Sequence, residues 1–245
     1  MFQNQVLDET PKKIMFSLVI PFFNEEKNVG FVLEELLEEL SGKDFTYEII
    51  AVNNGSTDRT SSVLRKYSNR NFIKVVILKE NRGFGWGIRQ GMKVASGEWI
   101  GFLGGDGQTD PKDLIKMMNI SQSRRDICMY TGYRIMRNDG KLRAIISKIF
   151  NCLFFTLFQV RLKDVNGTPK LIHGKIIRSL PLETKGWFLD AELILRLKAK
   201  KMSIVECPVI FRKRNSGKTH INLYTILEFI RKMLFYFFNR RNLIR

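Results

Sequence analysis

Glycines and a carboxylate that suit a phosphorylated ligand are concentrated in the stretch between Asn81 and Pro111. Three alternating glycines open it, Gly83, Gly85 and Gly87, and a helical run and a short apolar run then lead to Asp106. Glycine lets a backbone approach a ligand closely, and the start of a helix directs free N–H groups at an anion. A carboxylate at the carboxyl end of a strand lies where open α/β sheets bind ligands. This spacing predicts a site where phosphate and a metal ion meet.

Hydrophobic runs along the first half of the chain predict the elements that position this stretch. Strands are predicted at residues 16–20, 47–52, 72–78 and 99–103, and a helical pattern follows each one. Four such units predict a Rossmann-like α/β fold with a mainly parallel central sheet flanked by helices. Parallel strands end at one edge of a sheet, so the turn with Asn53 and Asn54 is expected beside Pro21 and Glu25.

The order of glycine run, helix, strand, Gly-Gly-Asp-Gly-Gln and Pro111 resembles the central block of family 2 glycosyltransferases. It is most similar to the dolichol-phosphate mannosyltransferase-like enzymes, which glycosylate polyprenyl phosphates. The resemblance covers nearly the whole chain and implies the single-domain nucleotide-sugar fold called GT-A. In that family the strand ends in Asp-x-Asp, whose carboxylates hold Mg²⁺ or Mn²⁺ on the diphosphate of the donor. Here Gly104 replaces the first carboxylate, and Asp106 and Gln108 remain as the predicted metal ligands.

The turn after the second predicted strand also resembles the family, which reads Val-Asp-Asp-Gly-Ser-Thr-Asp there and uses an acidic side chain against the nucleobase. This chain reads VNNGSTD from Val52 to Asp58, with amides at Asn53 and Asn54. Amides donate hydrogen bonds as well as accept them, whereas a carboxylate only accepts. The resemblance therefore implies a nucleotide site, and the choice between UDP and GDP stays open.

Three further segments resemble family segments at the donor or acceptor site. Gly132-Tyr133-Arg134 resembles Gly-x-Arg, the segment from Asp164 to Lys170 matches a site-lining segment, and Arg214 to Thr219 resembles the phosphate loop Arg-x-x-Gly-x-Ser. Guanidinium groups suit phosphate oxygens because they donate in a fixed fork. The resemblance implies these nucleotide-sugar ligands: Pro21, Phe23, Glu25, Asn53, Gly105, Asp106, Arg134, Lys170, Arg214 and Lys218. Asp106 and Asp190 are the predicted catalytic residues, with Asp190 as base if the acceptor is a hydroxyl group.

Two apolar segments raise the question of a membrane. Residues 144–160 carry one charge, Lys148, and match either a buried core helix or a helix in the membrane interface. In the resembling enzymes a helix here helps to admit the lipid. Residues 220–245 predict a separate amphipathic basic helix after a catalytic domain at 1–219, and it can equally pack on that domain. Whether these helices meet lipid or a second copy of the chain is left open.

Charge and cysteine content narrow the class of protein. The 245 residues carry a formal charge of +17, and the segment from Arg196 to Arg245 holds 13 basic and 2 acidic side chains. The basic residues coincide with apolar helices and form no recognised nucleic-acid module, so a nucleic-acid partner is not predicted. The three cysteines are far apart, which favours reduced thiols, and the polar first 13 residues show no secretory signal.

The predicted function is an inverting, metal-dependent transfer of sugar from a nucleoside diphosphate to a polyprenyl phosphate. The expected place is the cytoplasmic face of a membrane, with peripheral attachment. One alternative is transfer to a saccharide hydroxyl in envelope polysaccharide or glycan synthesis. Another is a degenerate relative that binds lipid or a partner without turnover, because Gly104, Asn53 and Asn54 depart from the family pattern.

Overall fold

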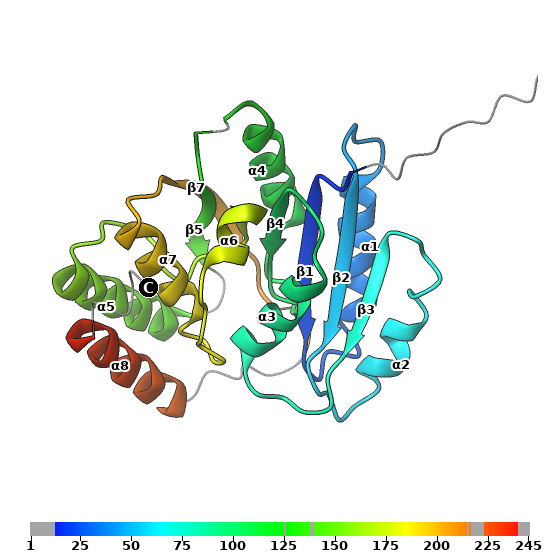
Figure 1. Cartoon of the computed structure of the whole chain (residues 1–245). Coiled ribbons are helices and arrows are strands. Elements are labelled where there is room, and N and C mark those ends of the chain that lie inside the picture. The colour runs from blue at the N-terminus through cyan, green and yellow to red at the C-terminus, as the bar shows by residue number, and fades with distance from the viewer. Residues whose placement is uncertain (1–12, 125, 138–139, 215, 217–222, 240–245) are drawn as a thin grey trace, which may run out of the picture.

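A computed structural model describes residues 13–124, 126–137, 140–214, 216 and 223–239 of the chain. The described residues form a seven-stranded sheet with helices on both faces (Figure 1). The strands are β1 (Phe16–Phe22), β2 (Tyr47–Asn53), β3 (Ile73–Ile77), β4 (Trp99–Phe102), β5 (Met129–Arg137), β6 (Lys170–His173) and β7 (Ile204–Phe211). This arrangement confirms the predicted α/β class with a mainly parallel sheet.

The strands lie in the order β3-β2-β1-β4-β6-β5-β7. The first four in this order run parallel, β6 is antiparallel to both of its neighbours, and β5 pairs with β7 in parallel. In the β4–β6 register, Phe102 at the end of β4 pairs with Lys170 at the start of β6. The segment that leads into β6 therefore arrives at the carboxyl end of β4, close to Asp106.

Helices cover the two faces of the sheet unequally (Figure 1). One face packs against α1 (Val29–Leu40), α2 (Thr60–Arg65) and α4 (Pro111–Ser123). The other face packs against α3 (Phe84–Val94), α5 (Lys141–Phe158), α6 (Gly174–Ser179), α7 (Leu189–Ala199) and α8 (Leu223–Phe238). Successive side chains of a strand point to opposite faces of the sheet. Phe16, Leu18 and Ile20 therefore pack on the face covered by α1, α2 and α4, while Val19 packs on the opposite face.

The C-terminal helix α8 packs against the same core as α5 and α7. Met233 and Tyr236 of α8 are buried, and Tyr236 stacks on Phe188 with ring centroids 5.7 Å apart. On its other side, α8 exposes large apolar side chains, and α5 does the same. Both segments therefore have one packed face and one exposed apolar face. The predicted domain boundary at 219–220 lies outside the described residues.

Two features of the sheet were not predicted. Strand β6 is only four residues long, and strand β5 continues to Arg137, whereas the sequence pattern predicts a strand only from Asp126 to Thr131. A four-residue strand carries too little periodicity to separate it from a turn, so β6 is recognised only through its pairing with β4 and β5.

Candidate active site

A cavity of about 500 Å³ opens at the carboxyl ends of β1, β2 and β4 and continues between α5 and α8. Its polar part is lined by Pro21, Phe23, Glu25, Asn54, Gly104, Gly105, Asp106, Gln108, Arg134, Asn166, Thr168, Asp190 and Arg214. Its apolar part is lined by Ile146, Ile149, Phe150, Leu153, Ile226, Phe229, Ile230 and Met233. The cavity thus joins a group of charged and amide side chains to an apolar channel.

The turn after β4 holds Asp106 in the cavity. Asp106 Oδ1 accepts a hydrogen bond from the backbone N–H of Gln108 at 3.2 Å, and Gln108 Nε2 donates to the carbonyl oxygen of Arg212 at 3.0 Å. A Cβ on Gly105 would lie 2.5 Å from the Phe22 ring, so only glycine lets this turn pack against β1. The turn is therefore fixed on both sides, and it presents one carboxylate.

These residues fit a divalent ion that is shared with a diphosphate. Within the described part of the chain, no three His, Cys, Asp or Glu side chains are grouped for a metal. Mg²⁺, however, is commonly bound by one or two carboxylates together with substrate phosphates and water. Asp106 supplies one such carboxylate, and the side-chain oxygen of Gln108 is the second predicted ligand.

Glu25 and Arg214 form an ion pair at the wall of the cavity, and both were predicted to bind the donor. Burial raises the pKa of Glu25, while hydrogen bonding from Asn28 and the charge of Arg214 oppose this shift. Asn28 also donates to the carbonyl oxygen of Ser216 at 3.2 Å. The loop after β7 is thereby attached to the loop between β1 and α1.

The two asparagines after β2 have different roles. Asn53 is buried, and its Oδ1 accepts the backbone N–H of Ser56 at 3.0 Å, so it shapes the turn and does not line the cavity. Asn54 lines the cavity; its Nδ2 donates to the carbonyl oxygen of Gly83 at 3.0 Å, and its buried Oδ1 accepts no hydrogen bond. Asn53 was the predicted nucleotide ligand, but of the two asparagines it is Asn54 that lines the cavity.

The glycine run does not form the predicted anion site. The backbone N–H groups of Gly85 and Trp86 donate to the carbonyl oxygens of Gly186 and Lys185, at 3.1 and 2.7 Å. A Cβ on Gly83 would lie 2.5 Å from the same carbonyl oxygen of Lys185. These glycines admit the neighbouring loop, and the start of α3 is already occupied by protein carbonyls.

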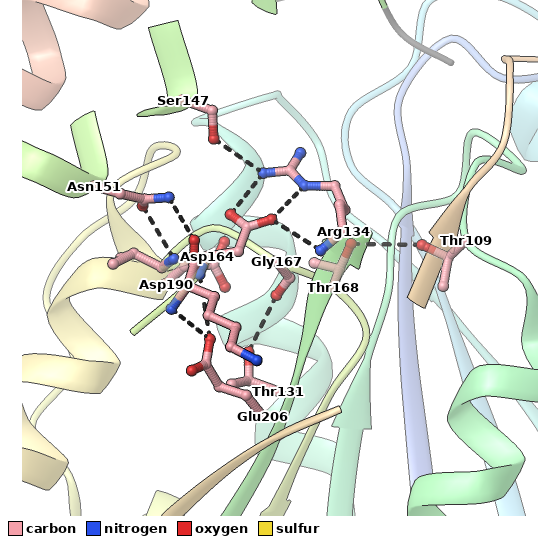
Figure 2. A network of polar contacts seen from close by, with 12 residues as sticks. Thr109, Thr131, Arg134, Ser147, Asn151, Asp164, Gly167, Thr168, Asp190 and Glu206 are labelled. Carbon is pink, nitrogen blue, oxygen red and sulfur yellow. Dashed lines mark hydrogen bonds and ion pairs between the residues drawn. The ribbon is translucent and has the colours of Figure 1, made fainter. Parts of the chain in front are cut away.

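Two buried ion pairs lie at the β5 and β6 side of the cavity, and each contributes one lining residue. Figure 2 shows the guanidinium of Arg134 paired with the carboxylate of Asp164. Arg134 Nε donates to Asp164 Oδ2 at 2.6 Å, and Arg134 Nη2 donates to Asp164 Oδ1 at 2.8 Å. Lys170 is completely buried; its Nζ lies 3.1 Å from Asp190 Oδ1 and donates to the carbonyl oxygens of Val165 and Gly167. Lys170 therefore does not line the cavity, contrary to its predicted role as a phosphate ligand.

The remaining predicted residues fall into two groups. Pro21, Phe23, Gly105, Gln108, Arg134 and Asp190 line the cavity as expected, together with Glu25, Asp106 and Arg214. Lys218 lies outside the described residues. Sequence reasoning missed Ser147, Asn166 and Thr168, which also line the cavity. Asn166 and Thr168 lie in the segment from Asp164 to Lys170, which matches the family in sequence. Ser147 lies in the apolar segment 144–160, and nothing in the sequence pattern marks it as a site residue.

The sheet order and the carboxylate after β4 define an α/β domain of the GT-A type. The model of the family "Glycosyl transferase family 2" matches residues 17–179, so the chain belongs to that family. The predicted enzyme class, a glycosyltransferase, is thereby confirmed.

Two curated relatives support the resemblance to enzymes of polyprenyl phosphates. Dodecaprenyl-phosphate galacturonate synthase of Rhizobium johnstonii is 34% identical over 174 residues, which are 70% of this chain and 51% of the relative. Dolichyl-phosphate beta-glucosyltransferase of Drosophila melanogaster is 31% identical over 233 residues, covering 86% of this chain and 71% of the relative. The chain thus spans about half the length of the first relative.

Solved structures share the fold. Glucosyl-3-phosphoglycerate synthase from Mycobacterium tuberculosis, in complex with Mn²⁺, UDP and glucosyl-3-phosphoglycerate, superposes with a TM-score of 0.71 at 16% identity. The match covers 90% of this chain and 77% of that chain. The same enzyme has also been solved with Mg²⁺ and UDP, with a TM-score of 0.69, 16% identity, and coverage of 90% and 77%. At this identity the likeness establishes the GT-A fold.

Proposed function

We propose that this chain transfers a sugar from a nucleoside diphosphate to a polyprenyl phosphate, with inversion at the anomeric carbon. The observation that carries the proposal is the cavity, which runs from Asp106 past Arg134 into the apolar channel between α5 and α8. A phosphorylated isoprenoid has the matching chemistry, because its anionic head is attached to a long apolar tail. The names of the relatives point to the same class of acceptor.

The donor is expected to lie along the edge of the sheet, with its nucleobase at Asn54. An N–H of the base that donates to Asn54 Oδ1 would satisfy a buried acceptor that otherwise has no partner. Because Asn54 Nδ2 already donates to the carbonyl oxygen of Gly83, the Asn54 side chain offers the ligand only its Oδ1, which is an acceptor. A carboxylate at this position would likewise offer only acceptors. The Asn therefore fits a nucleotide site, in the way the family uses an acidic side chain.

Asp106 and Gln108 would hold Mg²⁺ or Mn²⁺ against the diphosphate. Bound there, the ion would neutralise charge on the departing nucleoside diphosphate. Arg214 lines the same wall of the cavity and is paired with Glu25. When the donor binds, its guanidinium would leave Glu25 and donate to phosphate oxygens of the donor.

The acceptor phosphate is expected where the polar part of the cavity meets α5. Arg134, Arg143 and Ser147 line the cavity there. A phosphate oxygen of the acceptor attacks the anomeric carbon, the bond from that carbon to the diphosphate breaks, and the electron pair leaves with the nucleoside diphosphate. The attacking oxygen is already an anion near neutral pH, so this step needs no general base.

The exposed apolar faces of α5 and α8 are expected to rest on a membrane. Ile145, Ile149 and Leu153 of α5 are between 44% and 55% exposed, and so are several α8 side chains. No described helix is both long and apolar enough to cross a bilayer. The charge of +17 suits the cytoplasmic leaflet, which is rich in anionic lipid. We place the protein peripherally on that face.

The test is transfer of radiolabelled sugar from UDP-sugars and GDP-sugars to undecaprenyl or dolichyl phosphate, with Mg²⁺ or Mn²⁺ and again with EDTA. We expect a labelled lipid with one nucleotide class, and its loss with EDTA. Asp106→Asn should lower the rate by at least about 100-fold, since a group that stabilises transition-state charge is removed. The matched control is Asp126→Asn, because Asp126 is exposed and pairs with Arg124.

Three outcomes would contradict the proposal. Full metal-dependent turnover by Asp106→Asn would remove Asp106 from the site. Transfer to soluble saccharides, with none to polyprenyl phosphates, would favour the second candidate, in which Asp190 acts as the base. That candidate rests on the place of Asp190 in the cavity lining, and burial also raises the pKa of this carboxyl group. Binding of no sugar nucleotide at all would favour the degenerate relative.

A further inference from the structure

The buried pair of Lys170 and Asp190 has no place in the transfer step described above. Lys170 is completely buried and lines no part of the cavity, whereas Asp190 is 4% exposed and does line it. An anionic acceptor needs no base, and a carboxylate repels the phosphates of both substrates. The pair therefore needs another explanation.

The position of Asp190 along the site identifies what it meets. In the proposed function the nucleobase lies at Asn54, after β2, and the diphosphate lies at Asp106, after β4. The next strand in the sheet is β6, and Lys170 at its start pairs with Phe102 of β4. The part of the donor that follows the diphosphate is the sugar, so the sugar lies on the side of Asp190. Its hydroxyl groups are neutral hydrogen-bond donors, which a carboxylate accepts well.

The surroundings of Lys170 hold it in one position. Its Nζ donates to the carbonyl oxygens of Val165 and Gly167, and Gly167 O also accepts from Thr131 Oγ1 at 3.3 Å. A Cβ on Gly167 would lie 1.8 Å from the carbonyl oxygen of Gly132, so this segment is packed directly on β5. An ammonium fixed in this way can hold a carboxylate in one orientation.

We infer that Asp190 accepts a hydroxyl group of the transferred sugar, and that Lys170 is a positioning residue that holds Asp190 in place as a carboxylate. This inference rests on the proposed function, because it assumes a nucleoside diphosphate sugar as donor. It gives Asp190 a role in sugar recognition in place of general base catalysis.

The charged groups around Asp190 agree with this role. Burial raises the pKa of Asp190, Lys170 opposes that shift, Asp164 adds to it, and Arg134 opposes it. Asp164 is itself paired with Arg134, so Lys170 is the principal cation that opposes the rise in the pKa of Asp190. Without Lys170 the carboxyl group would be protonated up to a higher pH, and it would then no longer be an acceptor-only group.

The experiment compares the binding of a sugar nucleotide with that of the bare nucleotide, by calorimetry with Mn²⁺ present. The probes are UDP-glucose against UDP, and GDP-mannose against GDP. The ratio of the two dissociation constants reports the contribution of the sugar. We expect Asp190→Ala to lower the sugar contribution about tenfold, as for loss of a hydrogen bond to a charged group, with little change for the bare nucleotide. Asn54→Ala is the matched comparison, and it should weaken both ligands alike.

Lys170→Met separates positioning from simple loss of structure. In this variant the sugar contribution should be small at low pH and recover as the pH rises through the higher pKa of Asp190. The wild type should keep its sugar contribution over the same pH range. A purely structural defect would not recover with pH, so a flat profile would overturn the role of Lys170.

Two further results would overturn the inference while leaving the proposed function intact. One is an unchanged sugar contribution in Asp190→Ala. The other is an Asp190→Asn enzyme whose turnover number falls while donor binding stays normal, since that is the behaviour of a base. Failure of every nucleotide to bind the wild type would overturn both the inference and the proposed function.

Discussion

Asn54 has an amide where the family has a carboxylate, and the hydrogen bonds of its side chain explain how the amide can serve there. We predict that Asn54→Ala weakens binding of the preferred nucleoside diphosphate about tenfold, because one buried hydrogen bond to the base is lost. Calorimetry with UDP and GDP measures the effect. Asn53→Ala is the contrasting variant. It removes the acceptor of the Ser56 N–H, so it should lower the free energy of unfolding more than it lowers nucleotide affinity. Unchanged affinity in Asn54→Ala would remove Asn54 from the proposed nucleotide site.

Gly167 is required by a close backbone approach. A Cβ there would lie 1.8 Å from the carbonyl oxygen of Gly132, so Gly167→Ala should lower the free energy of unfolding by about 3 kcal/mol. Gly30→Ala is the matched control. Gly30 lies in the first turn of α1, where a Cβ would meet the Tyr67 hydroxyl at an ordinary 3.5 Å. That change should raise stability by up to about 1 kcal/mol, and urea unfolding of both variants checks the contrast.

Helix α8 shows how one element serves both packing and membrane contact. Met233 is 4% exposed and Leu234 is 46% exposed, although they are neighbours in sequence. We predict that Leu234→Asp lowers binding to anionic vesicles and leaves the free energy of unfolding within about 0.5 kcal/mol of wild type. Met233→Asp buries an unpaired charge and should cost about 3 kcal/mol or more. Sedimentation with phosphatidylglycerol vesicles and urea unfolding measure the two effects.

If Leu234→Asp binds vesicles as well as wild type does, the exposed face of α8 does not meet lipid. Size measurement in solution would then test the remaining alternative from the sequence, a contact between two copies of the chain.

Strand β2 carries an acidic residue that links several elements. Glu48 accepts from Ser17 Oγ of β1 and from the Ser96 N–H before β4, and it pairs with Lys74 of β3 at 2.6 Å. Burial alone would raise the pKa of Glu48, but the hydrogen bonds from Lys74, Ser17 and Ser96 lower it below its usual value of 4.5.

A lowered pKa in the folded state fixes the sign of the pH dependence. The stabilisation by Glu48 is complete above the unfolded pKa of about 4.5, and it is lost as the pH falls through the lower folded value. We predict that Glu48→Gln is less stable than wild type at pH 7, and that the difference shrinks below pH about 4.5. Urea unfolding across this range measures it. A difference that does not change with pH would exclude the ionised carboxylate as the cause.

The charge of the whole molecule makes a prediction about its partners. With +17 and exposed apolar helices together, binding to anionic vesicles should weaken with added salt and still persist at about 0.3 M NaCl, because apolar contact is not screened. Binding to duplex DNA depends on charge alone and should be lost by that salt concentration. Co-sedimentation with vesicles and a filter assay with DNA compare the two. The reverse order of salt sensitivity would favour a nucleic-acid partner.

The sequence by itself determined the fold class, the mainly parallel sheet and the position of Asp106 at a strand end. These features depend on local patterns: apolar runs of strand length, helical periodicity, and turn residues such as the glycines from Gly104 to Gly107. The resemblance to the family also implied that Glu25, Arg134, Asp190 and Arg214 belong to the site, and all four line the cavity.

Tertiary structure alone decided the direction in which each side chain points. Asn53 and Asn54 are adjacent and identical in type, and only the fold turns the second one toward the cavity. Lys170 looks like a phosphate ligand in the sequence, but antiparallel pairing with β4 buries it beneath Asp190. The glycines at the start of α3 look like an anion loop, yet the backbone N–H groups there donate to the carbonyl oxygens of residues 185 and 186. Residue type sets what a group can bind, whereas partners distant in sequence decide whether it is available.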